Sequence, residues 1–125
     1  AGELVGRYKK KRKAFNAISL TANTSVITCI ANDYGYKKIF ERQLEGLGKK
    51  GDLLIVMSTS GKSKNIINVL KKSKKMKIKC FALLGNNGGD CQKLSDYSLI
   101  IPSKNTANIQ EMHHLISHII CSLLD

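Results

Sequence analysis

Short apolar runs that alternate with segments of helical period constrain the fold of this chain more than any other feature. The runs are rich in Ile, Leu and Val without regular polar alternation, as in buried parallel strands. They span residues 16–20, 52–57, 78–84 and 97–101. Apolar residues recur at helical spacing in residues 36–47, 65–76 and 107–124. We therefore predict an α/β fold, a three-layer, doubly wound parallel sheet with helices on both faces.

The length of 125 residues fits one domain with one core, spanning residues 1–125. Residues 1–11 already look like the latter part of a helix, with Leu4, Val5 and Tyr8 at helical spacing. We expect the amino-terminal helix and first strand of the natural domain to precede Ala1. No apolar run is long enough to span a bilayer or to act as a secretory signal, so we expect a soluble, cytoplasmic protein.

Lysine dominates the charge of the chain. The sequence has 21 Lys and Arg against 9 Asp and Glu, a formal net charge of +12. This balance is compatible with nucleic acid, an anionic membrane or a small anionic substrate as partner. The excess gathers in residues 9–13 and 71–79, while the Arg and aromatic side chains that read or stack on bases are scarce. We interpret these runs as solvated surface and expect neither a nucleic-acid nor a membrane partner; a nucleic-acid binder is the alternative.

The four cysteines are widely scattered, and three of them lie in apolar runs. Neither a paired metal motif nor a disulfide framework has this spacing. We predict that Cys29, Cys80, Cys91 and Cys121 are reduced and mostly buried.

A run of hydroxyl residues follows the second apolar run. Residues 58–63 read STSGKS, directly after a predicted strand and before a predicted helix. Hydroxyls, a Gly and the free amides of a helix start can bind a phosphate at the carboxyl end of a parallel strand. The spacing is not that of a nucleotide P-loop, which favours a phosphorylated small molecule. The alternative is a Ser-rich turn with Ser63 as N-cap.

Two further segments carry polar side chains. Residues 85–89, GNNGG, follow the next strand at the same edge of the sheet, and their composition is that of a structural tight turn. On the last helix Gln110, His114 and His118 share one side, because they are spaced by four residues. For His113 and His114 we expect surface or satisfied core positions.

Four blocks in this order and spacing resemble the phosphoheptose isomerase family, whose domain is the sugar isomerase (SIS) domain. They are ELVGRY at 3–8, ANDYGY at 31–36, STSGKS at 58–63, and IQEMH at 109–113 with His118 downstream. The resemblance covers essentially all 125 residues. A Gly-rich loop and a His of the family would precede Ala1.

The resemblance implies an isomerase that converts sedoheptulose 7-phosphate to D-glycero-D-manno-heptose 7-phosphate through an enediol. This is the first step towards the ADP-heptose of the lipopolysaccharide core. It implies Glu3 as the base at carbon and His118 as its acid-base partner at oxygen, roles that suit a positioned carboxylate and an imidazole. The implied substrate contacts are Glu3, Asn32, Asp33, Ser58, Thr59, Ser60, Ser63 and Gln110.

Family resemblance also implies one zinc ion per subunit and a homotetramer with sites at subunit interfaces. The matching ligand positions are Glu3, Gln110 and His118. Gln110 and His118 are separated by about 12 Å along a regular helix, so both side chains must reach towards a common point. Zinc would polarise the carbonyl and stabilise the enediolate.

A rival from another class is a non-catalytic SIS protein that binds a sugar phosphate or the bacterial replication initiator. The pair of Glu3 and His118 discriminates between them, because the relative that binds the initiator does not keep this acid-base pair. We therefore expect an enzyme.

Overall fold

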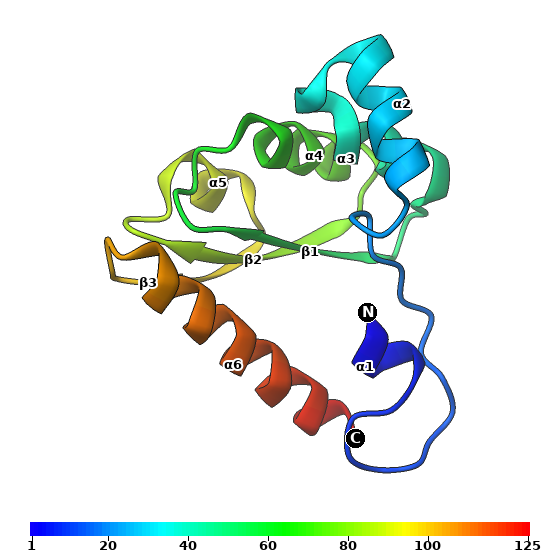
Figure 1. Ribbon diagram of the computed structural model, residues 1–125, viewed down its shortest axis with the longest axis vertical. Helices are drawn as coiled ribbons and strands as arrows, with labels where there is room; N and C mark the ends of the chain where they lie inside the picture. Colours follow the sequence, from blue (N-terminus) through cyan, green and yellow to red (C-terminus); the bar gives the residue numbers. More distant parts are fainter.

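The computed structural model describes residues 1–125 and contains a three-stranded parallel sheet with helices on both faces (Figure 1). The strands are β1 (Leu53–Ser58), β2 (Lys79–Gly85) and β3 (Tyr97–Ile101), side by side in that order. Leu53 pairs with Lys79 at the start of the β1–β2 ladder, and Gly85 pairs with Ile101 at the end of the β2–β3 ladder. These strands confirm three of the predicted runs to within a residue at either end, and with them the α/β fold.

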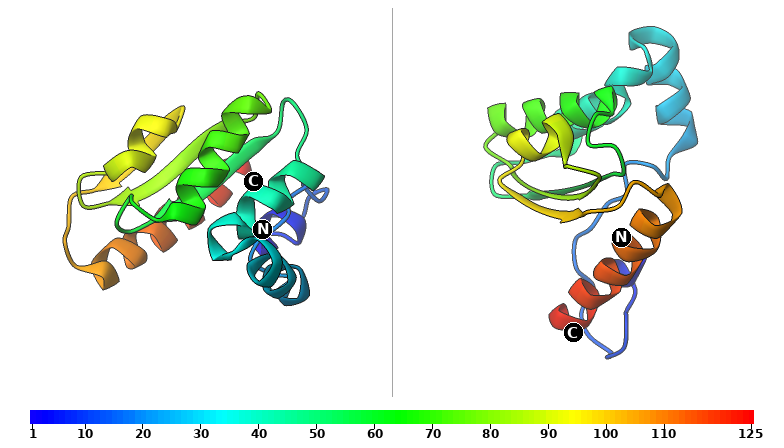
Figure 2. Two further views of the ribbon diagram at one scale, coloured as in Figure 1. Left: turned by 90° about the horizontal axis from the view of Figure 1, so that it is seen from above. Right: turned by 90° about the vertical axis from the view of Figure 1, so that its left-hand side faces the viewer.

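Helices α4 (Lys64–Lys75) and α5 (Gly89–Leu94) cover one face of the sheet, and α6 (Thr106–Leu124) covers part of the other (Figures 1 and 2). On the first face, α2 (Thr24–Tyr34), a 3-10 turn at Tyr36–Lys38 and α3 (Ile39–Leu47) extend beside α4. The single helix predicted over residues 36–47 is therefore this turn followed by α3.

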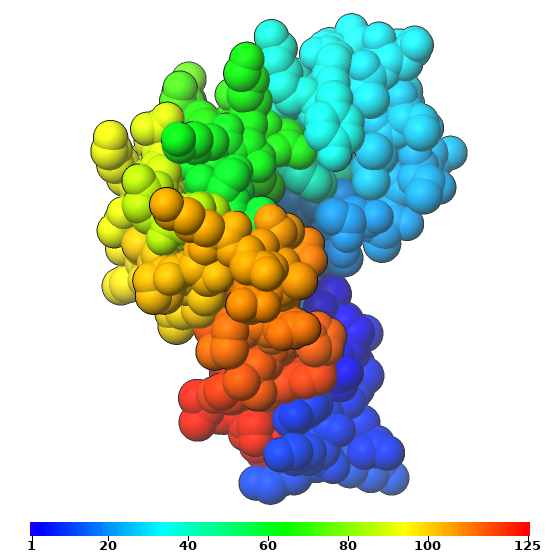
Figure 3. All heavy atoms as spheres, turned by 60° about the vertical axis from the view of Figure 1, so that its left-hand side comes forward, coloured from blue at the N-terminus to red at the C-terminus, as the bar shows by residue number.

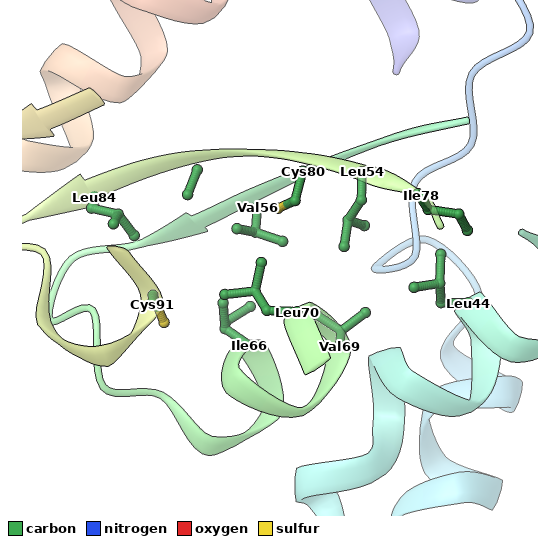
Figure 4. Packing of buried hydrophobic residues seen from close by; sticks show 11 residues of the cluster. Leu44, Leu54, Val56, Ile66, Val69, Leu70, Ile78, Cys80, Leu84 and Cys91 are labelled. Carbon is green, nitrogen blue, oxygen red and sulfur yellow. The ribbon is translucent and has the colours of Figure 1, made fainter. Parts of the chain in front are cut away.

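The main core lies between β1, β2 and the helices α3, α4 and α5 (Figure 4). Leu70, Cys80, Ala82 and Leu84 are completely buried in it. On the opposite face of β2, Leu83 is fully buried too, and so is Ile109 of α6. The middle strand therefore has apolar partners in both helical layers, as the absence of polar alternation predicted.

Only one face of β1 is covered. Its residues alternate between exposed and buried, and Leu53, Ile55 and Met57 are 58%, 42% and 50% exposed. The sequence predicted a strand buried on both faces. The prediction was wrong for this strand because α6 crosses beneath β2 and leaves the lower face of β1 without a helix.

Residues 16–20 do not form the predicted strand. A strand requires a neighbour that exchanges ladder hydrogen bonds with it, and no segment of this chain pairs with these residues. Instead the amide of Ala22 donates to the Ser19 carbonyl (3.3 Å), closing a turn, and the Gln43 side chain donates to the Leu20 carbonyl (2.9 Å).

The helix expected in residues 1–11 is a single turn, α1 (Gly2–Val5). It ends at Gly6, and the amides of Lys9 and Lys10 donate to the Asp125 carboxylate instead of to helix carbonyls. Helix α2 was not predicted, because its first turns are rich in Thr, Ser, Val and Ile, which are weak helix formers. The signal for it was Asn23, whose side chain caps the helix by accepting from Val26 N.

No helix of the structure has the length and apolar character needed to cross a membrane. The four cysteines are free, and three are buried while Cys29 is exposed. Burial raises the pKa of the Cys80 thiol to about 12 and that of Cys91 to about 11. The prediction of mostly buried cysteines is confirmed.

Candidate active site

The hydroxyl loop at residues 58–63 turns tightly at the carboxyl end of β1. The buried Ser58 hydroxyl accepts from the amide of Gly61 (3.1 Å) and lies 3.3 Å from the Ser63 hydroxyl. The Ser60 hydroxyl accepts from the amide of Lys62 (3.2 Å). Two side chains of the loop therefore stabilise its own turn.

Helix α4 begins directly after this loop. Ser63 occupies the N-cap position with φ −63° and ψ 121°, but its hydroxyl makes no capping hydrogen bond. A side chain does bond to one early amide, since Asn65 Oδ1 accepts from Ile66 N (2.9 Å). The start of a 12-residue helix, with its partial positive charge, thus opens towards the hydroxyl groups of residues 58–63. This is the arrangement expected of a phosphate cradle, and we use that name for residues 58–63.

The phosphate cradle is held in place by the glycine turn at residues 85–89. Cys91 N donates to the Gly61 carbonyl (3.0 Å), and the Asn86 side chain donates to the Thr59 carbonyl (2.9 Å). Gly61 has φ +65°, and a Cβ there would overlap the Gly88 carbonyl. The two loops therefore approach closely through main chain, with one added side-chain hydrogen bond from Asn86, which confirms the same-edge position and the structural role predicted for the second loop.

A hollow of about 440 Å³ lies between the phosphate cradle and α6. We call it the cradle hollow. Its polar lining combines cradle hydroxyls with one stripe of α6, and its residues are Met57, Ser58, Thr59, Ser63, Gln110, His113, His114 and Ser117. Four residues proposed from the sequence as substrate contacts, Ser58, Thr59, Ser63 and Gln110, thus line one hollow. Ser60 is absent from this lining.

His113 is a satisfied core histidine. It is 4% exposed, and its Nε2 lies 3.1 Å from the Leu84 carbonyl oxygen. This contact ties the first half of α6 to the end of β2. His114, one position later, is exposed and faces His118 with ring centroids 4.5 Å apart. The expectation of satisfied core and surface positions for the two residues is confirmed.

His118 lies one turn beyond His114 and is partly buried. Tyr8 stacks on its other side, with centroids 5.3 Å apart and planes inclined by 25°. The segment that carries Tyr8 packs along the carboxyl half of α6, as Figures 1 and 3 show. The orientation of the imidazole is therefore fixed by residues from both ends of the chain.

Asp125 and Arg12 anchor that segment. Asp125 accepts from Lys9 N (2.6 Å), Lys10 N (2.9 Å) and Arg12 Nε (2.7 Å). The two amides, more than the guanidinium, lower the pKa of the Asp125 carboxyl to about 2. Arg12 also donates to the Glu3 carbonyl (2.8 Å). One ion pair thus holds both the turn that bears Glu3 and the segment that bears Tyr8, and no local sequence pattern signals a contact over 113 positions.

Comparison with known proteins places the chain in a family. A family model described as the SIS domain matches residues 1–85. Phosphoheptose isomerase 1 of Campylobacter jejuni is 51% identical over 125 residues, which are 100% of this chain and 67% of that protein. The chain belongs to the phosphoheptose isomerase family. The relative from Akkermansia muciniphila is 46% identical over 100% of this chain and 66% of its own length.

Solved structures of this family have the same fold. Phosphoheptose isomerase from Francisella tularensis superposes with a TM-score of 0.94 at 38% identity, covering 99% of this chain and 66% of that one. The structure of phosphoheptose isomerase from Neisseria gonorrhoeae superposes with a TM-score of 0.93 at 37% identity, covering 100% of this chain and 66% of that one. The chain spans about two thirds of the length of these relatives. The predicted family and SIS fold are confirmed, and the relatives are enzymes by name.

Two residues taken from the family pattern lie away from the cradle hollow. Asn32 and Asp33 are exposed on α2 and bond to each other, Asn32 Nδ2 to Asp33 Oδ1 at 2.9 Å. Helix α2 lies on the face of the sheet opposite to α6. The chain by itself therefore does not bring these two side chains to the cradle.

The structure contains no cluster of the residue types that most often bind zinc. No group of three His, Cys, Asp or Glu side chains is placed to hold a metal ion. Gln110 lines the cradle hollow, whereas His118 lies two turns further along α6 between Tyr8 and His114. Zinc binding at Glu3, Gln110 and His118 stays a prediction.

Proposed function

We propose that this protein is an aldose–ketose isomerase that converts sedoheptulose 7-phosphate to D-glycero-D-manno-heptose 7-phosphate. The observation that carries the proposal is the cradle hollow, in which the hydroxyl groups of residues 58–63 face a polar stripe of α6. A phosphorylated sugar needs both parts, an anion site for one end and hydrogen-bonding groups for its hydroxyls. In the cell the product would supply ADP-heptose for the lipopolysaccharide core, and we place the reaction in the cytoplasm.

The phosphate would bind at the start of α4. Its oxygens would accept from early α4 amides and from the Ser63 and Thr59 hydroxyls, and the helix dipole favours its charge. Gln110 and His114, across the hollow, would then contact the sugar chain. Binding energy from the phosphate would thus help to position the carbonyl end of the sugar.

The proposed isomerisation requires one proton to move between two carbons and another to move between two oxygens. Glu3 would take the proton from C1 of the ketose to form a cis-enediol and return it to C2. His118 would take the proton from the C1 hydroxyl and give one to the oxygen at C2, so that the ketone becomes an alcohol and the alcohol an aldehyde. Tyr8 and Arg12 contribute by holding His118 and the turn that bears Glu3.

Assembly would complete the site. We propose a homotetramer in which Asn32 and Asp33 of another subunit reach the cradle hollow, because they are exposed and distant from it within one chain. The exposed apolar residues Leu53, Ile55 and Met57 give β1 a surface suited to burial.

A non-catalytic protein that binds a sugar phosphate is the alternative. The phosphate cradle would serve both functions equally. The presence of Glu3 and His118, each held by contacts to other parts of the chain, favours the enzyme.

The proposal is tested by incubating the intact protein with sedoheptulose 7-phosphate in deuterated water and following exchange of the C1 proton by NMR, with and without zinc. We expect exchange that is lost in Glu3→Gln and retained in Glu111→Gln, a matched change at an exposed α6 residue. Exchange that persists in Glu3→Gln would eliminate Glu3 as the base. Tight binding of the sugar phosphate without any exchange would assign the protein to the binding class.

A further inference from the structure

A second hollow, of about 480 Å³, lies on the outer side of the phosphate cradle. Its lining residues come from the loops after the three strands, at the carboxyl edge of the sheet. We call it the outer hollow, and its lining is Ser60, Lys62, Asn86, Asn87, Pro102, Ser103 and Lys104. It shares no residue with the cradle hollow, although the cradle loop contributes to both.

The outer hollow contains more free hydrogen-bond donors than acceptors. The hydroxyl oxygens of Ser60 and Ser103 already accept from the amides of Lys62 (3.2 Å) and Asn105 (3.1 Å), so each hydroxyl proton is free to donate. Asn87 uses its side-chain oxygen to accept from Gly89 N (3.3 Å), which leaves its NH₂ group without an acceptor in the chain.

Positive charge in this hollow is not neutralised by the protein. Lys62 and Lys104 are absent from all six ion pairs of the chain. No Asp or Glu is part of the lining. Other lysines, such as Lys38, Lys72 and Lys79, do have carboxylate partners. The outer hollow thus combines two free ammonium groups with neutral donors, a set that suits a phosphate dianion.

We propose that the outer hollow binds a second phosphate group, separate from the one at the cradle. Two sources share this chemistry. The group is either the second phosphate of a bisphosphorylated sugar that reaches across the loop, or a free phosphate or phosphomonoester that binds independently. The site requires neither Glu3 nor His118, so it stands whether or not the protein isomerises sugars.

The arrangement also predicts an interaction between the two sites. Ser60 and Lys62 of the outer hollow belong to the same six-residue loop as Ser58 and Ser63 of the cradle hollow. That loop is fixed by main-chain contact with Gly88 and Gly89. An anion that bonds to Lys62 would therefore restrain the cradle without touching the cradle hollow.

The experiment is an NMR titration of the intact, ¹⁵N-labelled protein with inorganic phosphate at constant ionic strength, with chloride as the balancing anion. We expect saturable shifts at the amides of Asn87 and Lys104. Lys104→Gln should weaken this binding about three- to tenfold, as expected when one partly exposed charged hydrogen bond is lost. Ser63→Ala should weaken only the response of the cradle amides.

Lys50→Gln is the matched control, because Lys50 is exposed and precedes β1 at the opposite edge of the sheet. Equal losses in Lys104→Gln and Lys50→Gln would overturn the proposal, as would shifts at Asn87 that chloride reproduces. Fructose 1,6-bisphosphate then distinguishes the two sources. If one equivalent of the bisphosphate abolishes the further shifts that inorganic phosphate and a sugar monophosphate each cause, one ligand bridges both hollows, whereas independent saturation by phosphate and a sugar monophosphate indicates two separate ligands.

Discussion

Substituting Gly61 by Ala tests the contact that holds the phosphate cradle in shape. Its φ of +65° is left-handed, which costs a residue with a Cβ about 1–2 kcal/mol. The added methyl would also overlap the Gly88 carbonyl, so the two loops must separate and the hydrogen bond from Cys91 N to the Gly61 carbonyl is lost, at about 1 kcal/mol. We expect the free energy of unfolding to fall by about 2–3 kcal/mol, or roughly 10 °C in Tm.

Gly51→Ala separates the two causes. Gly51 also has a positive φ, +96°, but a Cβ there would meet nothing within 4 Å. This control variant should lose only the backbone contribution and should retain its affinity for sugar phosphates. The measurements are chemical denaturation and calorimetric titration with sedoheptulose 7-phosphate. If Gly61→Ala matches Gly51→Ala in both stability and affinity, the two loops do not depend on close main-chain contact.

Three further outcomes are expected from buried or paired groups. The folded-state pKa of Asp125, about 2, lies below the ordinary value, so its carboxylate stabilises the fold above about pH 4 and loses this effect as the pH falls towards 2. The Tm of Asp125→Asn should therefore depend less on pH between pH 4 and pH 2 than the Tm of the parent protein. At pH 8 a thiol reagent should label Cys29 rapidly but should label Cys80 and Cys91 only when the protein unfolds. Fast labelling of three or more thiols in the native state would contradict the burial of these side chains. His113→Leu should lower the free energy of unfolding, measured by urea denaturation, by about 1–3 kcal/mol, because the Leu84 carbonyl loses its contact with the imidazole. A stability equal to that of the parent protein would argue against this hydrogen bond.

The sequence predicted well wherever the pattern is local. Continuous apolar runs located β1, β2 and β3 to within one residue, because apolar residues without polar alternation are typical of strands in a parallel sheet. The hydroxyl run at residues 58–63 was placed correctly at a strand end and helix start because it directly follows one of these runs. An apolar run with no available neighbour, residues 16–20, gave a wrong prediction, since pairing is a property of the whole sheet.

Tertiary contacts account for what the pattern could not indicate. Nothing in the composition of residues 85–89 shows that Gly88 touches Gly61, and no motif links Arg12 to Asp125. Asn32 and Asp33 are separated from the cradle hollow because α2 covers the face of the sheet opposite to α6, which the sequence of α2 does not indicate (Figure 1). The roles of Glu3 and His118 stay predictions, because position alone does not identify a proton-transfer group.

The contact between Asp125 and the segment at residues 9–12 also has a consequence for the order of folding. It closes a loop of nearly the whole chain, and the entropic cost of closure grows with the logarithm of loop length. The sheet, α4 and the phosphate cradle depend on contacts between residues much nearer in sequence. The contact of Tyr8 with His118 lies within this long loop, so during refolding we expect it to form after the sheet and the loop at residues 58–63.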